Sequence, residues 1–242
     1  MAAAIRAGPK LMQRPGQVYF VTGTDTGVGK TFASCAILEA ARQAGLSTAA
    51  SKPLAAGGER TASGIHNEDA LLLQQHCSPP LSYEDINPLC LEQAIAPHLA
   101  AVQEGIRLQV DALASSVQGI IGKGADLTLV EGAGGWRVPL NSQETMADLV
   151  KALQLPVILV VGMRLGCLNH ALLSVEAIQR DGLKLHGWVA NHIDPQMPFQ
   201  EENLDTLKEL IAAPLIARLP WQEASPHRAV NLNALTSQSG FA

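Results

Sequence analysis

The chain has few aromatic residues and few charges: aromatic side chains make up 4% of its 242 residues, and Asp, Glu, Lys and Arg together make up 16%. A core must therefore consist mainly of Ala, Leu, Val and Ile, and the 47% share of hydrophobic residues is large enough for one. No Lys/Arg run interleaved with aromatics is present and the net charge is −5, which argues against nucleic acid as the main partner. No apolar run approaches the roughly 18 residues of a membrane span, so we expect no membrane partner.

Cysteine is also scarce. Cys35, Cys77, Cys90 and Cys167 match no zinc-binding spacing and indicate no disulfide framework. Small, buried free thiols in a reducing compartment are the expected state. Residues 1–17 lack the apolar stretch and the Ala-x-Ala cleavage site of a secretory signal, so we expect an untargeted flexible leader. These features together predict a cytoplasmic location.

Short apolar runs alternate with helical patterns over residues 18–235, and we expect one domain there, followed by a tail at 236–242. Strands that are apolar throughout predict a parallel sheet buried on both faces. The predicted fold is α/β, a single doubly wound and mostly parallel sheet with helices on both faces. The Gly- and Ala-rich residues 54–68 are expected to form a loop, and a Pro-rich connection precedes residue 98. The expected strands are 18–21, 48–51, 127–130, 157–161, 185–190 and 215–219, and the expected helices are 32–44, 69–76, 98–102, 108–121, 144–153, 169–180 and 199–211.

Residues 23–31 read Gly-Thr-Asp-Thr-Gly-Val-Gly-Lys-Thr, between the first apolar run and the first helical pattern. A strand, a Gly-rich turn and a helix in this order are typical of a phosphate-binding P-loop. The glycines let backbone N–H groups face phosphate oxygens, and the helix N-terminus adds partial positive charge. Because Lys30 can reach the terminal phosphates and the Thr31 hydroxyl can bind Mg²⁺, the loop predicts a nucleoside triphosphate with a divalent cation.

This loop departs from the strict P-loop pattern. Thr24 stands where the pattern requires Gly, and Gly27 is additional. The structural alternative is an ordinary Gly-rich turn, which the Gly-Lys-Thr ending between a strand and a helix disfavours.

Polar residues follow the predicted strands at the edge where ligands bind in open parallel sheets. Glu131 ends an apolar strand, and we interpret it as a metal ligand beside Thr31 rather than a solvated carboxylate. Lys52 is either a surface lysine or a group that stabilises charge on a transferring phosphoryl group, and the P-loop favours the second interpretation. Asp69 opens a helix, and its spacing alone predicts N-terminal capping.

Asn169 follows Gly166 and precedes a helical run. It is either a plain N-cap or part of an anion site at the helix N-terminus, where backbone N–H groups can hold a carboxylate. Trp136 and Trp221 are expected to be packing residues, and the sequence contains no Ser-His-Asp arrangement. The histidines, which show no metal-binding spacing and are expected at the surface, include His66, His76 and His186.

Nine short motifs occur in order along the chain. They are Gly23–Thr31, Lys52-Pro53, Asn67-Glu-Asp69, Asn87-Pro88, Pro97-His98, Val130-Glu-Gly-Ala-Gly-Gly-Trp136, Leu165-Gly-Cys-Leu-Asn-His170, Gly187-Trp-Val-Ala-Asn191 and Leu219-Pro-Trp221. Together they closely resemble the dethiobiotin synthetase family over about residues 18–235, which is far more specific than the P-loop alone.

The resemblance implies an ATP-dependent cyclo-ligase of biotin biosynthesis that acts as a homodimer of P-loop domains. In this family, CO₂ joins 7,8-diaminopelargonate (7,8-diaminononanoate), and a cyclic urea closes while ATP becomes ADP and phosphate. One amine forms a carbamate, the carbamate attacks the γ-phosphate, and the second amine attacks the resulting carbamic–phosphoric anhydride. Two adjacent amines need no protein nucleophile, which agrees with finding none.

The resemblance also implies roles for single residues. The catalytic pair would be Lys30 and Lys52, and Mg²⁺ would be held by Thr31, Asp69 and Glu131, which replaces capping as the interpretation of Asp69. Implied substrate residues are Thr26 near the amines, Lys52, Ala56, and Asn169, which would hold the substrate carboxylate across the dimer interface. The residues implied to bind ATP are Gly27, Val28, Gly29, Lys30, Thr31, Phe32, Glu131, Gly132, Ala133, Gly134, His192 and Gln222, together with Asn191 at the adenine edge and Pro220 and Trp221 lining the base pocket.

Several positions depart from the family pattern. Many members carry Glu at position 27 and Ser at positions 56 and 96, where this chain has Gly27, Ala56 and Ala96. Arg164 replaces a frequent Lys, and no acidic nucleotide contact is obvious near His227. These changes concern fine contacts to nucleotide and substrate, whereas the metal and phosphate groups are retained.

Two other classes share a related P-loop. A partitioning-type ATPase switch usually carries a Lys early in the loop, where Thr24 stands, and often has basic elements for membrane or DNA, which are not seen here. An amidotransferase-like ligase would need a glutaminase domain or partner, for which the chain has no room. The sequence therefore favours the cyclo-ligase.

Overall fold

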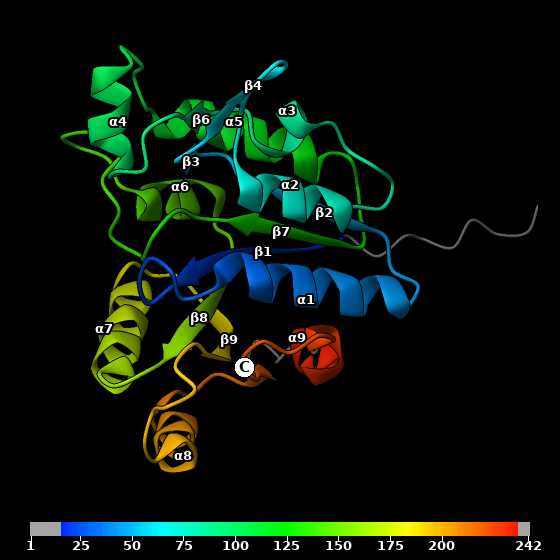
Figure 1. The fold of residues 1–242 in the computed structure, drawn as a ribbon, viewed down its shortest axis with the longest axis vertical. Coiled ribbons are helices and arrows are strands. Elements are labelled where there is room, and N and C mark those ends of the chain that lie inside the picture. The colour runs from blue at the N-terminus through cyan, green and yellow to red at the C-terminus, as the bar shows by residue number, and fades with distance from the viewer. Residues whose placement is uncertain (1–15, 237–242) are drawn as a thin grey trace, which may run out of the picture.

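The computed structural model of the protein describes residues 16–236, which form an α/β domain around a six-stranded sheet (Figure 1). The strand order is β10-β9-β8-β1-β7-β2, and every neighbouring pair is parallel, so the predicted fold class is confirmed. The expected leader and tail lie outside the described residues, apart from Gly16, Gln17 and Thr236. The strands of this sheet are β1 (Gln17–Gly23), β2 (Thr48–Ser51), β7 (Leu127–Glu131), β8 (Val157–Met163), β9 (Leu185–His192) and β10 (Leu215–Leu219).

Helices cover both faces of the sheet, and each predicted helix is present with ends that differ by a few residues. Within residues 16–236, no helix is both long enough and apolar enough to cross a bilayer. The helices are α1 (Lys30–Gln43), α2 (Glu68–Gln75), α3 (Tyr83–Ile86), α4 (Pro97–Gln103), α5 (Val110–Ile121), α6 (Met146–Leu153), α7 (Cys167–Arg180), α8 (Gln200–Leu210), η1 (Pro226–Ala229) and α9 (Leu232–Thr236).

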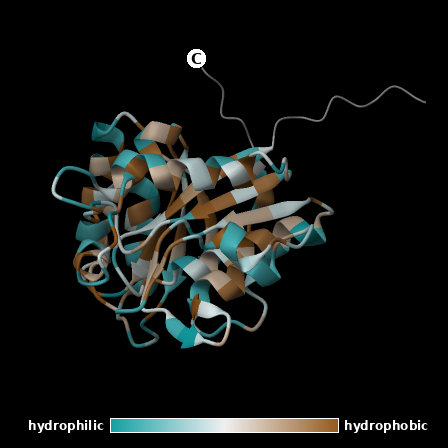
Figure 2. Ribbon diagram, turned by 90° about the horizontal axis from the view of Figure 1, so that it is seen from above, coloured by the Kyte–Doolittle hydropathy of each residue, from teal (hydrophilic) through white to brown (hydrophobic). Residues whose placement is uncertain are grey.

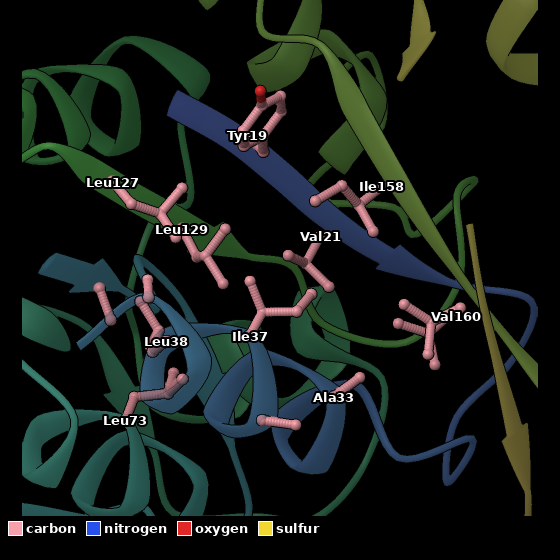
Figure 3. Packing of buried hydrophobic residues seen from close by; sticks show 14 of the residues in the cluster. Tyr19, Val21, Ala33, Ile37, Leu38, Leu73, Leu127, Leu129, Ile158 and Val160 are labelled. Carbon is pink, nitrogen blue, oxygen red and sulfur yellow. The ribbon is translucent and has the colours of Figure 1, made fainter. Parts of the chain in front are cut away.

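Alternate residues of each strand face opposite sides of the sheet, which gives two apolar layers from continuous apolar runs. In β1, Tyr19 and Val21 pack in one layer with α1, whereas Phe20 packs in the other. Figure 3 shows Ile37 of α1 pointing toward Val21 and the neighbouring β7. Each fully buried aliphatic side chain of this kind contributes about 1.5–3 kcal/mol. The strands at the centre of Figure 2 are accordingly largely brown.

The expected loop at 54–68 is wrong, because it contains short strands. β3 (Ala55–Ala56) pairs with β6 (Cys90–Leu91), and β4 (Glu59–Thr61) forms a hairpin with β5 (Gly64–His66). These strands are too short to give a period-2 pattern, and β4 is exposed, so no apolar signal marks it. The Pro-rich connection likewise contains α3.

Caps explain why two of these helices, α6 and α7, begin at other residues than expected. α7 begins at Cys167, two residues early, with Gly166 as its N-cap at a φ of 94°. Asn169 therefore lies within the first turn, and its interpretation as the N-cap is wrong. α6 begins at Met146, after a capping box in which Thr145 and Asp148 exchange hydrogen bonds. Both differences arise because caps depend on local backbone geometry that apolar periodicity does not report.

All four cysteines are free, as expected. Cys77 and Cys167 are buried, but Cys35 and Cys90 are only partly buried. Burial raises the pKa of the Cys35 thiol to about 12, so this thiol stays protonated and unreactive at neutral pH.

The last helix is fixed to β1 and to β9 by two hydrogen bonds that share one carbonyl acceptor. The Tyr19 hydroxyl donates to the Leu235 carbonyl at 2.7 Å, and His186 Nε2 lies 2.8 Å from the same oxygen. His186 is only 8% exposed, so its predicted surface position is wrong. Figure 1 shows α9 beside α1, although the two helices are far apart in the sequence.

Burial lowers the pKa of His186 below its ordinary value, and the pKa of His192 is lowered in the same way. As pH falls through about 6.5, these histidines therefore become protonated more readily in the unfolded chain than in the folded chain. Their contribution to stability is present above that range and lost below it.

We predict that the free energy of unfolding, measured with urea, falls between about pH 7.5 and pH 5.5. It should fall less in His186→Gln, whose amide donates to Leu235 without titrating. The control is His170→Gln, which removes an exposed histidine. Equal pH slopes for His186→Gln and the unmodified protein would contradict this account.

Candidate functional site

The loop between β1 and α1 adopts the shape that its glycines permit. Gly27 and Gly29 have φ angles of 74° and 81°, in the left-handed region that favours glycine. A Cβ atom at Gly29 would lie 2.1 Å from Asn191 Nδ2, so this glycine is also needed for close approach. Asn191 lies at the end of β9 and donates from Nδ2 to the Val28 carbonyl at 2.8 Å. Asn191 thus holds the loop, a contact that the sequence did not predict.

A buried carboxylate lies beneath the start of α1. Glu131, at the end of β7, has no exposed surface, which excludes the alternative of a solvated strand-end carboxylate. Its Oε1 accepts hydrogen bonds from Thr31 Oγ1 at 2.7 Å and from Lys52 Nζ at 2.8 Å. Its Oε2 accepts from Ser34 Oγ at 2.8 Å. Glu131 therefore gathers the first turns of α1 and the end of β2 around one charge.

Lys52 and Asp69 form the second half of this centre. Lys52 Nζ lies 2.6 Å from Asp69 Oδ2 and is 4% exposed, which excludes a surface role. Burial alone would lower the pKa of Lys52, but Glu131 and Asp69 outweigh burial and raise that pKa. Burial opposes ionisation of Asp69, yet Lys52 holds the pKa of Asp69 below its ordinary value. The cap of α2 is Asn67, whose side chain accepts from the Ala70 N–H, so Asp69 is not the capping residue.

Lys30 is buried without a compensating partner. It is 8% exposed, and its side chain makes no hydrogen bond or ion pair with any residue in the range 16–236. Burial lowers the pKa of Lys30, and the charge of Glu131 offsets this only in part. Lys30 lines two cavities, so a phosphate that entered them would meet its ammonium group and stabilise its charge.

The oxygens of Thr31, Asp69 and Glu131 fit a hard divalent cation by their chemistry, because Mg²⁺ prefers oxygen donors and usually keeps some water. The Lys52 ammonium bridges the two carboxylates, so these oxygens already face a positive charge. Within residues 16–236, no cluster of three or more His, Cys, Asp or Glu side chains forms a metal site by itself. A cation here would therefore have few protein ligands, and phosphate oxygens and water would complete its coordination.

Two adjoining cavities open beside this centre. The larger, of about 580 Å³, is lined by three of the four predicted substrate residues, Thr26, Lys52 and Ala56, and also by Ala96. The other, of about 450 Å³, is lined by five of the predicted ATP-binding residues. Both cavities border Lys30 and Asp69. The five residues are Gly27, Gly29, Lys30, Thr31 and Phe32.

A third cavity, of about 280 Å³, lies where β9 and β10 end. It is lined by His192, Pro220 and Trp221, three of the residues predicted to bind ATP. Trp221 is 47% exposed and is therefore not a core packing residue, unlike Trp136 at 4%. Gln222 does not line this cavity.

Several other predicted residues do not line the 450 Å³ cavity. Gly132 packs under Phe20, whose Cζ would lie 2.7 Å from an added Cβ. Ala133 and Gly134 line the 580 Å³ cavity instead. Asn169 is exposed on the first turn of α7 and lines none of the three cavities. A single chain therefore does not bring Asn169 to the other site residues.

Two contacts at the departures from the family pattern were not predicted. Arg164 pairs with Asp25 of the loop at 2.8 Å. His227 lies 3.1 Å from Gln43, the last residue of α1, and so is at the opposite end of that helix from the loop. Ser34 was also missed, although its position four residues after Lys30 puts it on the same helix face.

Solved structures with the same fold are P-loop nucleoside triphosphatases. The signal recognition particle receptor FtsY from Elizabethkingia anophelis, in complex with GDP, matches with a TM-score of 0.51 and 13% identity over 93% of this chain and 62% of that chain. A ParA family ATPase from Chlorobium tepidum matches with a TM-score of 0.51 and 14% identity over 92% of this chain and 94% of that chain. At such identities the likeness concerns the fold alone.

Sequence comparisons give the family. A family model described as an AAA domain matches residues 17–228. A protein named ATP-dependent dethiobiotin synthetase BioD from Pseudomonas aeruginosa is 57% identical over 209 residues, which is 86% of this chain and 92% of the relative. The protein named ATP-dependent dethiobiotin synthetase BioD 1 from Escherichia coli K12 is 47% identical over 211 residues, which is 87% of this chain and 93% of the relative. With this identity along nearly the whole length of each relative, the chain belongs to the dethiobiotin synthetase family.

Proposed function

We propose that the protein is a dethiobiotin synthase, an ATP- and Mg²⁺-dependent ligase that carboxylates 7,8-diaminononanoate and closes the cyclic urea. The observation that carries this proposal is the unpaired, buried Lys30 between a nucleotide-sized cavity and the larger cavity bordered by Lys52. Such a site suits a phosphoryl acceptor that lies beside ATP, as the carbamate of the diamine would. Membership of the family supports the same reaction.

In this proposal the protein positions the reactants and supplies charge. The loop N–H groups and Lys30 hold the terminal phosphates, and the α1 N-terminus adds its dipole. Lys52 stabilises the carbamate and the charge that develops during phosphoryl transfer. The second amine then displaces phosphate, so ring closure needs no protein nucleophile.

Mg²⁺, when bound, would neutralise phosphate charge, and Thr31, Asp69 and Glu131 would hold it. Since Lys52 bridges both carboxylates, its ammonium group and a divalent cation draw on the same oxygens. The adenine base would lie in the 280 Å³ cavity against Trp221, with Asn191 near its edge. The diamine would lie in the 580 Å³ cavity against Thr26 and Ala56.

We further propose a homodimer in which Asn169 and the start of α7 reach the partner's substrate carboxylate. Support comes from the apolar surface around Asn169, where Leu165 is 85% exposed and Leu173 is 57% exposed. Exposed leucines of this kind favour a protein contact. The domain boundaries at 18 and 235 and the cytoplasmic location stay predictions.

The function is tested by incubating the purified protein with ATP, Mg²⁺, bicarbonate and the diamine, with dethiobiotin measured by mass spectrometry. We expect product and diamine-dependent ADP release, and we expect Lys30→Gln to lose at least about 10²-fold in kcat because a charge on the phosphates is missing. Its fold should persist, since a buried charge is removed rather than added. The exposed Lys208→Gln serves as the control. ATP consumption that does not depend on the diamine would contradict the assignment as a ligase.

Asp69→Asn tests the metal site. The substitution removes one of two carboxylates, so we expect the Mg²⁺ concentration for half-maximal activity to rise by about tenfold or more. Glu84→Gln is the control, because it removes an exposed acid from the first turn of α3 and lines neither cavity of the site. A Mg²⁺ titration that is equal in both variants would remove Asp69 from the metal site.

Mixed dimers test the interface. Asn169→Ala and Lys52→Gln are each expected to be inactive, but a mixture of the two should regain up to about a quarter of normal activity, because a mixed dimer contains one intact site. Lys30→Gln mixed with Lys52→Gln should regain none, since both residues belong to the same chain's site. If subunits exchange and the first mixture stays inactive, each site is built from one chain.

A further inference from the structure

We propose that Tyr83 is a positioning residue, which with Asn87 fixes the end of β2 relative to the start of α2 and thereby sets the geometry of Lys52 against Asp69. Neither residue lines the site cavities described above. This inference rests on the proposed function, because it assigns Lys52 and Asp69 to turnover.

The Tyr83 hydroxyl joins two segments. Tyr83 begins α3 and is 9% exposed. Its hydroxyl accepts a hydrogen bond from the Asn67 N–H at 2.8 Å and donates to Asn87 Oδ1 at 2.8 Å. Asn67 is the N-cap of α2, two residues before Asp69. The hydroxyl therefore fixes the residue from which the helix that carries Asp69 begins.

Asn87 fixes the other partner. Its Nδ2 donates to the main-chain carbonyl of Lys52 at 2.7 Å and to that of Leu89 at 3.1 Å. The Lys52 N–H in turn donates to the Ile86 carbonyl at 2.7 Å. The main chain of Lys52 is thus held on both sides by consecutive residues, 86 and 87. A continuous path of hydrogen bonds runs from Lys52 through Asn87 and Tyr83 to Asn67.

This path matters because the contact that it sets is short. Lys52 Nζ and Asp69 Oδ2 are 2.6 Å apart, and charge-assisted hydrogen bonds of this length weaken quickly when one group moves. The chain reaches α2 through the hairpin β4–β5, whose first strand is exposed at all three of its residues and therefore adds little packing restraint. Polar groups that orient ligating side chains typically change metal affinity or activity by about 10–100-fold when removed.

If Tyr83 had a purely structural role, loss of its hydroxyl would lower stability and leave the metal-dependent steps unchanged. The chain contains a matched control for that case. Its other tyrosine, Tyr19, is also buried and donates its hydroxyl to the Leu235 carbonyl at 2.7 Å. Burial raises the pKa of both hydroxyls to about 12, so neither ionises at neutral pH. The difference between them is that only Tyr83 connects to Lys52 and Asp69.

The experiment compares full-length Tyr83→Phe, Tyr19→Phe and the unmodified protein. Thermal unfolding measures stability, calorimetry measures ADP binding with and without Mg²⁺, and steady-state assays give kcat and KM. We expect Tyr83→Phe to raise the Mg²⁺ concentration needed for half-maximal ADP binding by about tenfold and to lower kcat by about 10–100-fold, without changing Mg²⁺-free ADP binding. Tyr19→Phe should lower stability and leave the Mg²⁺ dependence and kcat unchanged.

The inference is overturned if Tyr83→Phe keeps the normal Mg²⁺ dependence and kcat, or if Tyr19→Phe loses as much of both. Should Tyr83→Phe fail to fold, Asn87→Asp takes its place, because it keeps the acceptor for Tyr83 but removes the amide that donates to Lys52. An unchanged Asn87→Asp variant would then overturn the inference. ADP binding needs no diamine, so an unmodified protein that binds ADP with Mg²⁺ yet makes no dethiobiotin would refute the proposed function alone.

Discussion

The burial of one carboxylate constrains the whole site. Glu131 has no contact with solvent, so its charge is tolerable only if protein donors replace water. Those donors come from α1 through Thr31 and Ser34, and from the end of β2 through Lys52. Removing one partner of a buried charged group typically costs about 3–5 kcal/mol. The need to satisfy Glu131 therefore places the P-loop helix and the second strand in a fixed relation.

The two buried lysines of the site lie in opposite electrostatic environments. Lys52 is compensated by two carboxylates, which raise its pKa despite burial. Lys30 lacks such a partner within the described residues, and burial lowers its pKa. The protein thus satisfies one cation and leaves the other without a direct partner. Under the proposed function, the phosphates of ATP would supply the missing counter-charge to Lys30.

The sequence predicted the sheet well because apolar runs report burial directly. It also placed Lys52 and Glu131 at strand ends and Thr31 beside the loop after the first strand, and the structure brings these three residues together. It could not predict features that depend on which segments meet in space. The role of Asn191 under the loop and that of Ser34 beside Glu131 are contacts between residues far apart in the chain. The spacing-based prediction that Asp69 caps α2 was wrong, because the cap is Asn67. The choice of cap depends on backbone angles that composition does not encode.

The bond between Tyr19 and Leu235 has a consequence for biosynthesis. Leu235 is 1% exposed and belongs to the same apolar layer as Val21 and Ile37, so the layer beneath the first strand is completed by nearly the last residues that the structure describes. Because a ribosome makes the chain from its N-terminus, the inner face of α1 can be fully covered only after α9 has been synthesised. Closure of this layer is therefore a late event that follows translation of almost the entire domain.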